Sequence, residues 1–172
     1  MRAARVRGGS RAGPAGGRIL RWCPPILWTG VVFVLSSDLA SEAHTRRFII
    51  PVLRFFFFGL SPETYALLHG VLRKLAHLTE YAVLSALWAR ALAGRGARWR
   101  ARHVAAALTI CILTAIGDEV HQAWVPSRSS SAADVGIDTL GALAGQLAVG
   151  LGTRRRRWAV DAEGLGIGSY PQ

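Results

Sequence analysis

Four stretches of mostly apolar residues recur along the chain and are separated by shorter basic or polar segments. They cover residues 22–37, 75–92, 104–117 and 135–151, and the third is expected to continue toward Trp124. Each stretch approaches the roughly 20 residues that a helix needs to cross a bilayer, and reaches that length when its polar ends are included. The pattern therefore predicts an all-α, polytopic membrane protein with four transmembrane helices.

A shorter apolar segment, residues 48–60, lies between the first two stretches. It contains four consecutive phenylalanines, and Pro51 and Arg54 interrupt it. The segment is too short to span a bilayer and too apolar to be a free loop, which favours a short interfacial or re-entrant segment. A fifth span is the less favoured alternative.

The basic residues indicate an orientation. Fifteen of the 21 Lys and Arg residues lie before the first stretch, around the link between the second and third, or after the fourth. Because such residues concentrate in cytoplasmic segments, both termini are expected in the cytoplasm. The chain then divides into a disordered basic tail (1–21), a membrane domain (22–152) and a second cytoplasmic tail (153–172). Residues 22–37 also resemble a signal-peptide core, but an uncleaved anchor preserves the charge pattern.

Composition supports a membrane protein over a nucleic-acid-binding protein. Hydrophobic residues make up 51% of the chain, and the mean hydropathy is +0.29. A formal charge of +11 could indicate nucleic acid. The arginines, however, form short blocks between apolar stretches and do not interleave with aromatic residues. We therefore expect a lipid bilayer and no nucleic acid as partner, while the oligomeric state stays open.

Half of the ten acidic residues belong to three short clusters in or beside the apolar stretches. The clusters are Lys74-x-x-His77-x-x-Glu80-Tyr81, Asp118-Glu119-x-His121-Gln122 and Asp134-x-x-x-Asp138. Ionisable side chains at membrane depth are costly and usually mark function. The predicted topology puts all three clusters at the outer ends of their spans, so we expect one shared site near the outer leaflet.

The candidate site residues are assigned by chemistry. His77 and Glu80 are i,i+3 neighbours that could form a base with its orienting acid, a metal-ligand pair or a structural ion pair. On the third span, Asp118, His121 and Gln122 should share a face, with Glu119 pointing elsewhere. The candidate catalytic residues are Lys74, His77, Glu80, Asp118, Glu119, His121, Asp134 and Asp138, and the candidate substrate-binding residues are Tyr81, Gln122 and Arg128.

Two acidic residues open the fourth stretch. Asp134 follows Ser131 at the spacing of a capping box, so it also fits a purely structural helix cap. Asp138 lies one turn deeper and shares a face with Gly141 and Gly145. Because Gly-x-x-x-Gly permits close helix approach, this face is expected to pack inward with Asp138 on it. Arg128, in the preceding loop, could bind a phosphate or carboxylate, or pair with the acids.

These elements, in this order, resemble the VanZ-like family of bacterial membrane proteins. The matching positions are Leu35-Ser36-Ser37, the three acidic clusters, Arg128, Gly141 and Gly145, and the resemblance covers about residues 28–150. Asp138 departs from the family, which often has Asn there. The resemblance implies a polytopic protein of the cell envelope. The named member of the family is associated with low-level resistance to the glycopeptide teicoplanin, and the resemblance names no reaction.

Three functional hypotheses follow, and they leave open whether the protein is an enzyme. The first is a membrane-embedded enzyme or binding site for a lipid-linked or cell-wall precursor. The second is a non-catalytic membrane factor whose polar cluster is a structural ion-pair core. The third is a small oligomeric transporter. No cofactor is expected, although the acids and histidines could supply the oxygen and nitrogen ligands of a divalent metal.

Overall fold

The computed structural model describes residues 19–38, 41–94, 100–126 and 130–164, and it describes side chains only as far as residue 153. Most of the expected tail over residues 1–21 and the candidate ligand-binding residue Arg128 therefore lie outside the described residues. All regular secondary structure in the described ranges is helical, as the sequence predicts. The helices are α2 (Cys23–Leu35), α3 (Glu42–Phe56), α4 (Pro62–Ala93), α5 (Ala101–Ala123) and α6 (Ala132–Gly164).

Local capping signals fix where α3 and α4 begin. Ser41 and Ser61 are the N-cap residues, and their hydroxyl oxygens accept hydrogen bonds from the backbone N–H groups of His44 (3.4 Å) and Thr64 (3.3 Å). Pro62 then occupies the first turn of α4, where its missing N–H costs nothing. As a result α4 starts well before residue 75 and extends the expected second apolar stretch by several turns.

The segment after the first stretch folds as α3, a helix that continues through Pro51. Its 15 residues span only about 22 Å at 1.5 Å per residue, which is less than the hydrocarbon thickness of a bilayer. At the other end of the chain, α6 stays helical to Gly164 and includes residues that the sequence assigns to the second tail.

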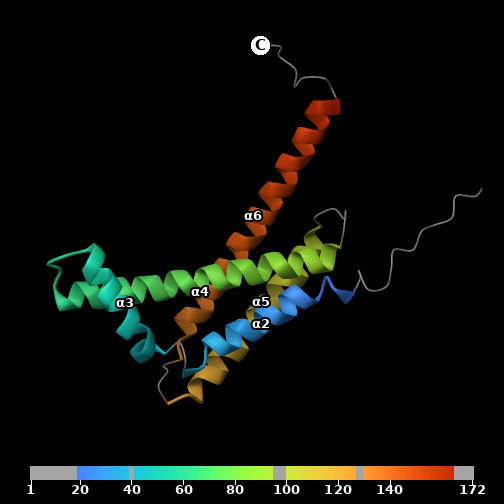
Figure 1. Ribbon diagram of the computed structural model, residues 1–172. Coiled ribbons are helices and arrows are strands. Elements are labelled where there is room, and N and C mark those ends of the chain that lie inside the picture. The colour runs from blue at the N-terminus through green and yellow to red at the C-terminus, as the bar shows by residue number, and fades with distance from the viewer. Residues whose placement is uncertain (1–18, 39–40, 95–99, 127–129, 165–172) are drawn as a thin grey trace, which may run out of the picture.

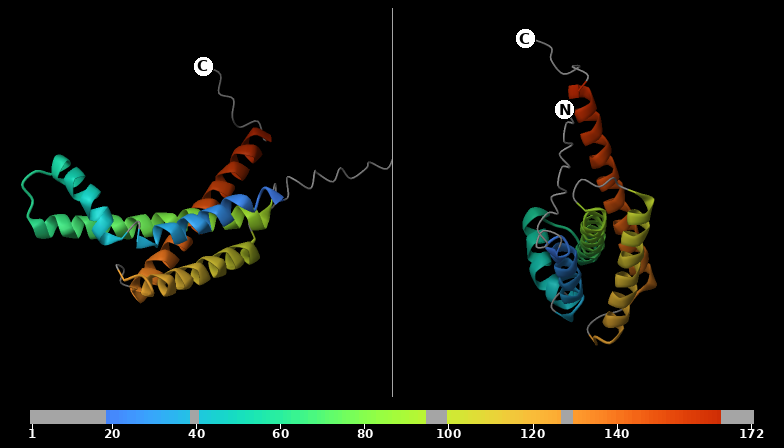
Figure 2. Two further views of the ribbon diagram at one scale, coloured as in Figure 1. Left: turned by 60° about the horizontal axis from the view of Figure 1, so that its bottom comes forward. Right: turned by 90° about the vertical axis from the view of Figure 1, so that its right-hand side faces the viewer.

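Helix α4 is the centre of the arrangement, because α2, α3, α5 and α6 all pack against it (Figures 1 and 2). The most extensive of these contacts is with α6, which crosses α4 and then projects beyond the other helices (Figure 1). The core between the helices is formed by Val32, Tyr81, Leu84, Cys111, Ala115 and Ala142. Trp28 of α2 adds a hydrogen bond from its indole Nε1 to the carbonyl of Glu80 (3.0 Å).

Two glycines bring the backbones of α4 and α6 together. A Cβ at Gly141 would overlap the backbone carbonyl of Leu78, and one at Gly145 would overlap that of Ala82. Both glycines are buried. Only glycine leaves room for this approach, so the Gly-x-x-x-Gly face packs inward against α4, as the sequence predicts.

Two described helices are long and apolar enough to cross a membrane, namely Ala101–Ala123 and Ala132–Thr153. Helix α2 is apolar but shorter, so the expected number of four spans stays a prediction. Large apolar side chains on α5 and α6 remain exposed on the outside of the helix cluster, including Leu113 (64%) and Leu147 (65%). Such surfaces suit contact with lipid.

Replacing Gly141 with Ala is expected to destabilise the protein by about 1–3 kcal/mol, because the added methyl group forces α4 and α6 apart. Thermal or denaturant unfolding in detergent measures this change. Gly136→Ala on the same helix is the matched control, since nothing lies within 4 Å of a Cβ there. A Gly141→Ala protein as stable as the control would contradict the close approach.

Candidate functional site

A histidine and an aspartate meet where α4 and α6 approach each other. His77 Nδ1 lies 3.3 Å from Asp138 Oδ1, and the side chains are 12% and 0% exposed respectively. The first glycine contact joins Leu78, which follows His77 on α4, to Gly141, three residues after Asp138 on α6. The same close approach of the helices therefore brings His77 and Asp138 together. Neither oxygen of Asp138 accepts a hydrogen bond within the described residues. The carboxylate is thus buried with one ionisable neighbour and free acceptor capacity.

Helix α5 contributes a second buried polar pair. Gln122 Nε2 donates a hydrogen bond to Asp118 Oδ2 (2.9 Å), and both side chains are fully buried. Asp118 Oδ1 and Gln122 Oε1 have no hydrogen-bond partner among the residues that the structure describes. Because an unpaired buried polar atom costs about 1–3 kcal/mol, these atoms are candidates for contact with a polar ligand.

Tyr81 links the two pairs. It follows His77 by one helical turn on α4, is 0% exposed, and its hydroxyl has no hydrogen-bond partner in the described ranges. Asp138 of α6 and Asp118 of α5 both lie within electrostatic range of this hydroxyl. The structure therefore brings side chains from all three acidic clusters together around Tyr81.

Glu119 lies on a different flank of α5 from Asp118, as helical spacing predicts. It is buried, and its Oε2 accepts a hydrogen bond from the backbone N–H of Ser131 (2.6 Å), just before α6 begins. Its carboxylate therefore engages the start of α6 and not the Asp118–Gln122 pair. The buried stripe of α5 runs through Cys111, Ala115, Asp118 and Gln122, and the flank bearing Glu119 is the one covered by the start of α6.

His121 lies on the other flank of α5 and does not join the cluster. It is exposed, and its ring packs edge-on against Phe33 of α2 with 6.3 Å between centroids. The expectation that it shares the buried face of Asp118 was therefore wrong. Helical spacing places the two residues about 60° apart, which is enough to separate a buried position from an exposed one.

A small cavity of about 140 Å³ adjoins His77. It is lined by Glu42, His69, Gly70, Arg73, Lys74, His77 and Asp134. Lys74 is exposed and Asp134 half-buried, so both belong to the mouth of the site and not to its buried part. Arg73 lies 3.9 Å from Glu42 of α3. We use "entrance cavity" for this space.

His69 and Arg73 are site-lining residues that the sequence reading missed. His69 lies two turns and Arg73 one turn before His77 on the same stripe of α4. The sequence did not reveal this stripe because the helix was expected to begin at residue 75. His69 lies outside that expected span, is 2% exposed, and shares a hydrogen bond with Thr45 Oγ1 (3.1 Å).

A further buried polar contact was also missed. Gln146 Nε2 of α6 donates hydrogen bonds to Ser85 Oγ (2.7 Å) and to the Ser85 carbonyl (3.0 Å) on α4. A lone glutamine inside an apolar stretch was the available signal. Glu80 is half-buried on α4 and engages other groups. Within the described ranges, no group of three His, Cys, Asp or Glu residues is arranged to hold a metal ion.

Comparison with known proteins identifies one matching family. The model of the VanZ/LLP1 family matches residues 22–151. No curated protein and no solved structure matches the chain. The matched range runs from the start of α2 into α6 and contains the whole buried polar cluster. The chain therefore belongs to the VanZ/LLP1 family.

Proposed function

We propose that this protein is a polytopic membrane protein of the bacterial cell envelope that binds the polar headgroup of a lipid-linked or cell-wall precursor. The observation that carries the proposal is the His77–Asp138 pair. Asp138 is fully buried, its Oδ1 lies 3.3 Å from His77 Nδ1, and neither carboxylate oxygen accepts a hydrogen bond within the described residues. Ionisable groups at such depth are retained at a cost and are most often functional.

The size and charge of the entrance cavity support a headgroup as the ligand. Its volume of about 140 Å³ is well below the roughly 300–1,000 Å³ of pockets that enclose a whole drug-sized molecule. A polar group at the end of a lipid fits such a space while its chain remains in the bilayer. Arg73 and Lys74 line this space together with Glu42 and Asp134, and the two cations can attract an anionic group such as a phosphate.

The His77–Asp138 pair also suits acid–base chemistry on that headgroup. With Nδ1 directed at Asp138, the tautomer with a free Nε2 is favoured, and Nε2 can accept a proton from an attacking water or hydroxyl. The imidazolium is then stabilised by the carboxylate and returns the proton to the leaving group. The 3.3 Å separation allows a hydrogen bond that tightens when a ligand binds.

A second function, a non-catalytic membrane factor, is favoured by two contacts. Glu119 accepts a hydrogen bond from the backbone N–H of Ser131, which fastens α5 to the start of α6, and Gln122 pairs with Asp118 within α5. In this alternative the site recognises a lipid or a protein partner without turnover. The two functions share their residues and differ in whether His77 transfers a proton.

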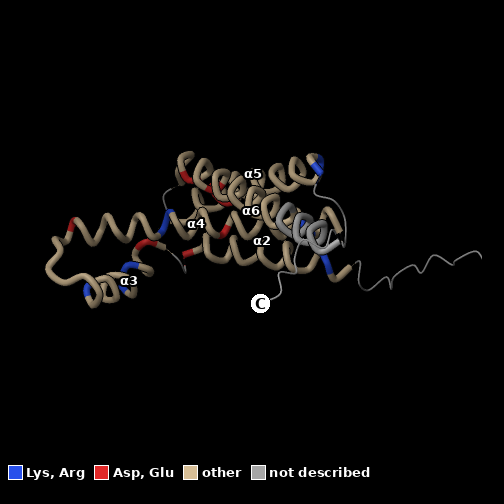
Figure 3. Tube along the Cα trace, turned by 90° about the horizontal axis from the view of Figure 1, so that it is seen from above, with Lys and Arg blue, Asp and Glu red and all other residues tan. Residues whose placement is uncertain are grey.

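We further propose that α2, α4, α5 and α6 cross the membrane with both termini in the cytoplasm. The contacts His77–Asp138 and Ser85–Gln146 advance in the same direction on both helices, so α4 and α6 run parallel. If α4 and α6 cross the membrane in the same direction, the chain must cross back once between them, and α5 is the helix that connects them. In Figure 3 the Asp and Glu residues whose side chains are described lie in one half of the helix cluster, together with some Lys and Arg, whereas the opposite end shows only Lys and Arg among the described residues.

Reporter fusions test this topology. A fusion after Gly94 is expected to give a cytoplasmic signal, and one after Ser130 a periplasmic signal, because the arginines beside Gly94 favour the cytoplasm. A cytoplasmic signal at Ser130 would contradict the outward-facing site.

The proposed ligand is tested with purified protein and a radiolabelled lipid-linked cell-wall precursor. We expect the wild-type protein to bind and convert it, and His77→Gln to lower turnover by at least about 100-fold because the proton acceptor is lost. Asp138→Asn should also lower turnover. His103→Gln, at the far end of α5, is the matched control.

Binding and turnover are measured separately, and melting temperatures confirm that the variants fold. If the wild-type protein binds the precursor without converting it, and His77→Gln abolishes this binding, the result supports the non-catalytic factor. If His77→Gln and Asp138→Asn both bind and convert the precursor as well as the wild-type protein does, the His77–Asp138 pair is not the site of the proposed function.

A further inference from the structure

Helix α3 has two chemically opposite faces. Arg46, Ile50 and Arg54 follow one another at i,i+4 spacing, which places them on one ridge of the helix. Phe48 and Phe55 lie on the other side and are 74% and 70% exposed. A helix with large exposed apolar side chains opposite arginines is typical of one that lies in the membrane–water interface.

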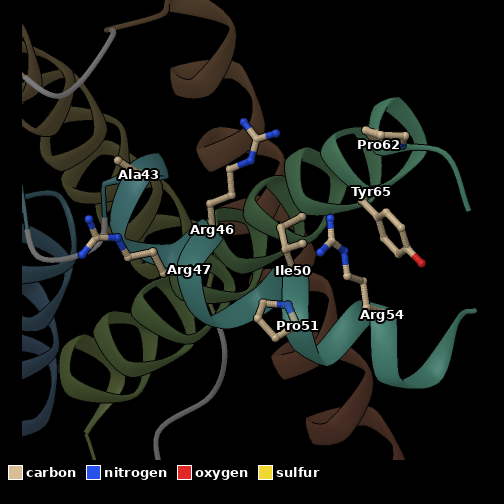
Figure 4. Close-up of a pocket in the computed structure, with 8 residues that line it drawn as sticks. All are labelled: Ala43, Arg46, Arg47, Ile50, Pro51, Arg54, Pro62 and Tyr65. Carbon is tan, nitrogen blue, oxygen red and sulfur yellow. The ribbon is translucent and has the colours of Figure 1, made fainter.

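The arginine ridge borders a hollow between α3 and the start of α4. Its volume is about 350 Å³, and its lining residues are Ala43, Arg46, Arg47, Ile50, Pro51, Arg54, Pro62 and Tyr65. Figure 4 shows Arg46 and Arg54 on either side of Ile50, with the Tyr65 ring beside Arg54, while Arg47 extends away from Arg54. Three arginines line the hollow, and Arg46 and Arg54 are the two that flank it on either side of Ile50.

Both flanking cations are available to an anion. No carboxylate in the described ranges lies within 4.0 Å of Arg46 or Arg54, whereas Glu42 is next to Arg73. The Arg54 guanidinium lies 5.6 Å from the centre of the Tyr65 ring, a cation–π contact that leaves its N–H donors free. The Tyr65 hydroxyl donates to the Phe57 carbonyl (2.6 Å), which fixes this ring in place.

The hollow is held in shape by contacts between α3 and α4. Besides the Tyr65 contact, Thr45 of α3 shares a hydrogen bond with buried His69 of α4 (3.1 Å). These contacts lie near the two ends of α3. The arginines are thus presented from a fixed helix, which reduces the entropy cost of binding.

We propose that this hollow binds the phosphate of an anionic phospholipid, with the phenylalanine face of α3 inserted at the acyl boundary. Arg46 and Arg54 are eight residues apart, or about 12 Å along the helix, so two long side chains can converge on one phosphate between them. Guanidinium groups bind phosphate through paired hydrogen bonds. This site uses residues other than the His77–Asp138 pair, so it stands or fails independently of the proposed precursor chemistry.

The test measures headgroup binding by the full-length protein in a neutral detergent. Short-chain phosphatidylglycerol, phosphatidylcholine with the same chains, and inorganic phosphate are titrated by calorimetry. Each arginine near an anionic headgroup contributes about a fivefold factor to affinity, so Arg46→Gln with Arg54→Gln should weaken phosphatidylglycerol binding about 25-fold. Arg100→Gln with Arg102→Gln, at the start of α5, carries the same charge change and should alter the affinity less than about twofold.

Several results would overturn the proposal. They are an unchanged affinity in the Arg46/Arg54 double variant, an equal loss in the Arg100/Arg102 control, or equal binding of the two lipids. Inorganic phosphate binding as tightly as the lipid would assign the hollow to a free anion instead. If the glutamine variant does not fold, Arg46→Lys with Arg54→Lys preserves charge, and its predicted loss of affinity reports the paired hydrogen bonds.

Discussion

The close backbone approach of α4 and α6 is the constraint on which the rest of the structure depends. Gly141 and Gly145 lie directly on the carbonyls of Leu78 and Ala82. On either side of these contacts the same two helices pair polar side chains, His77 with Asp138 and Ser85 with Gln146. Because the two backbones lie this close together, each pair of polar side chains can meet between the helices and away from lipid.

The buried polar groups divide into those that hold the fold and those that have unused hydrogen-bonding capacity. Gln146 and Glu119 each make short hydrogen bonds to another segment and serve the fold. Asp138 and Tyr81 are equally buried but have no hydrogen-bond partner in the described part of the chain. A buried charge contributes little to stability and is costly when unpaired. The asymmetry is what a ligand site requires, because a ligand can supply the missing partners.

Much of the fold followed from the sequence, because apolar periodicity and capping residues act locally. The helical class, the inward packing of Gly141 and Gly145 and the grouping of the three clusters could all be inferred. The orientation of α5 could not, because a difference of about 60° between His121 and Asp118 decides burial and depends on where α6 begins. The contact between Glu119 and Ser131 joins residues that only the folded loop brings together. The hollow on α3 was missed because an apolar run concealed its arginine ridge.

The central claim is that His77 and Asp138 interact directly in the interior between α4 and α6. A double-mutant cycle measures this interaction most directly, using His77→Ala, Asp138→Ala and the double variant with reversible unfolding in detergent. The structure predicts that the effects on the free energy of unfolding are non-additive, with a coupling energy of about 1–3 kcal/mol. Effects that add to within about 0.5 kcal/mol would show that the two side chains do not interact and would contradict the site described above.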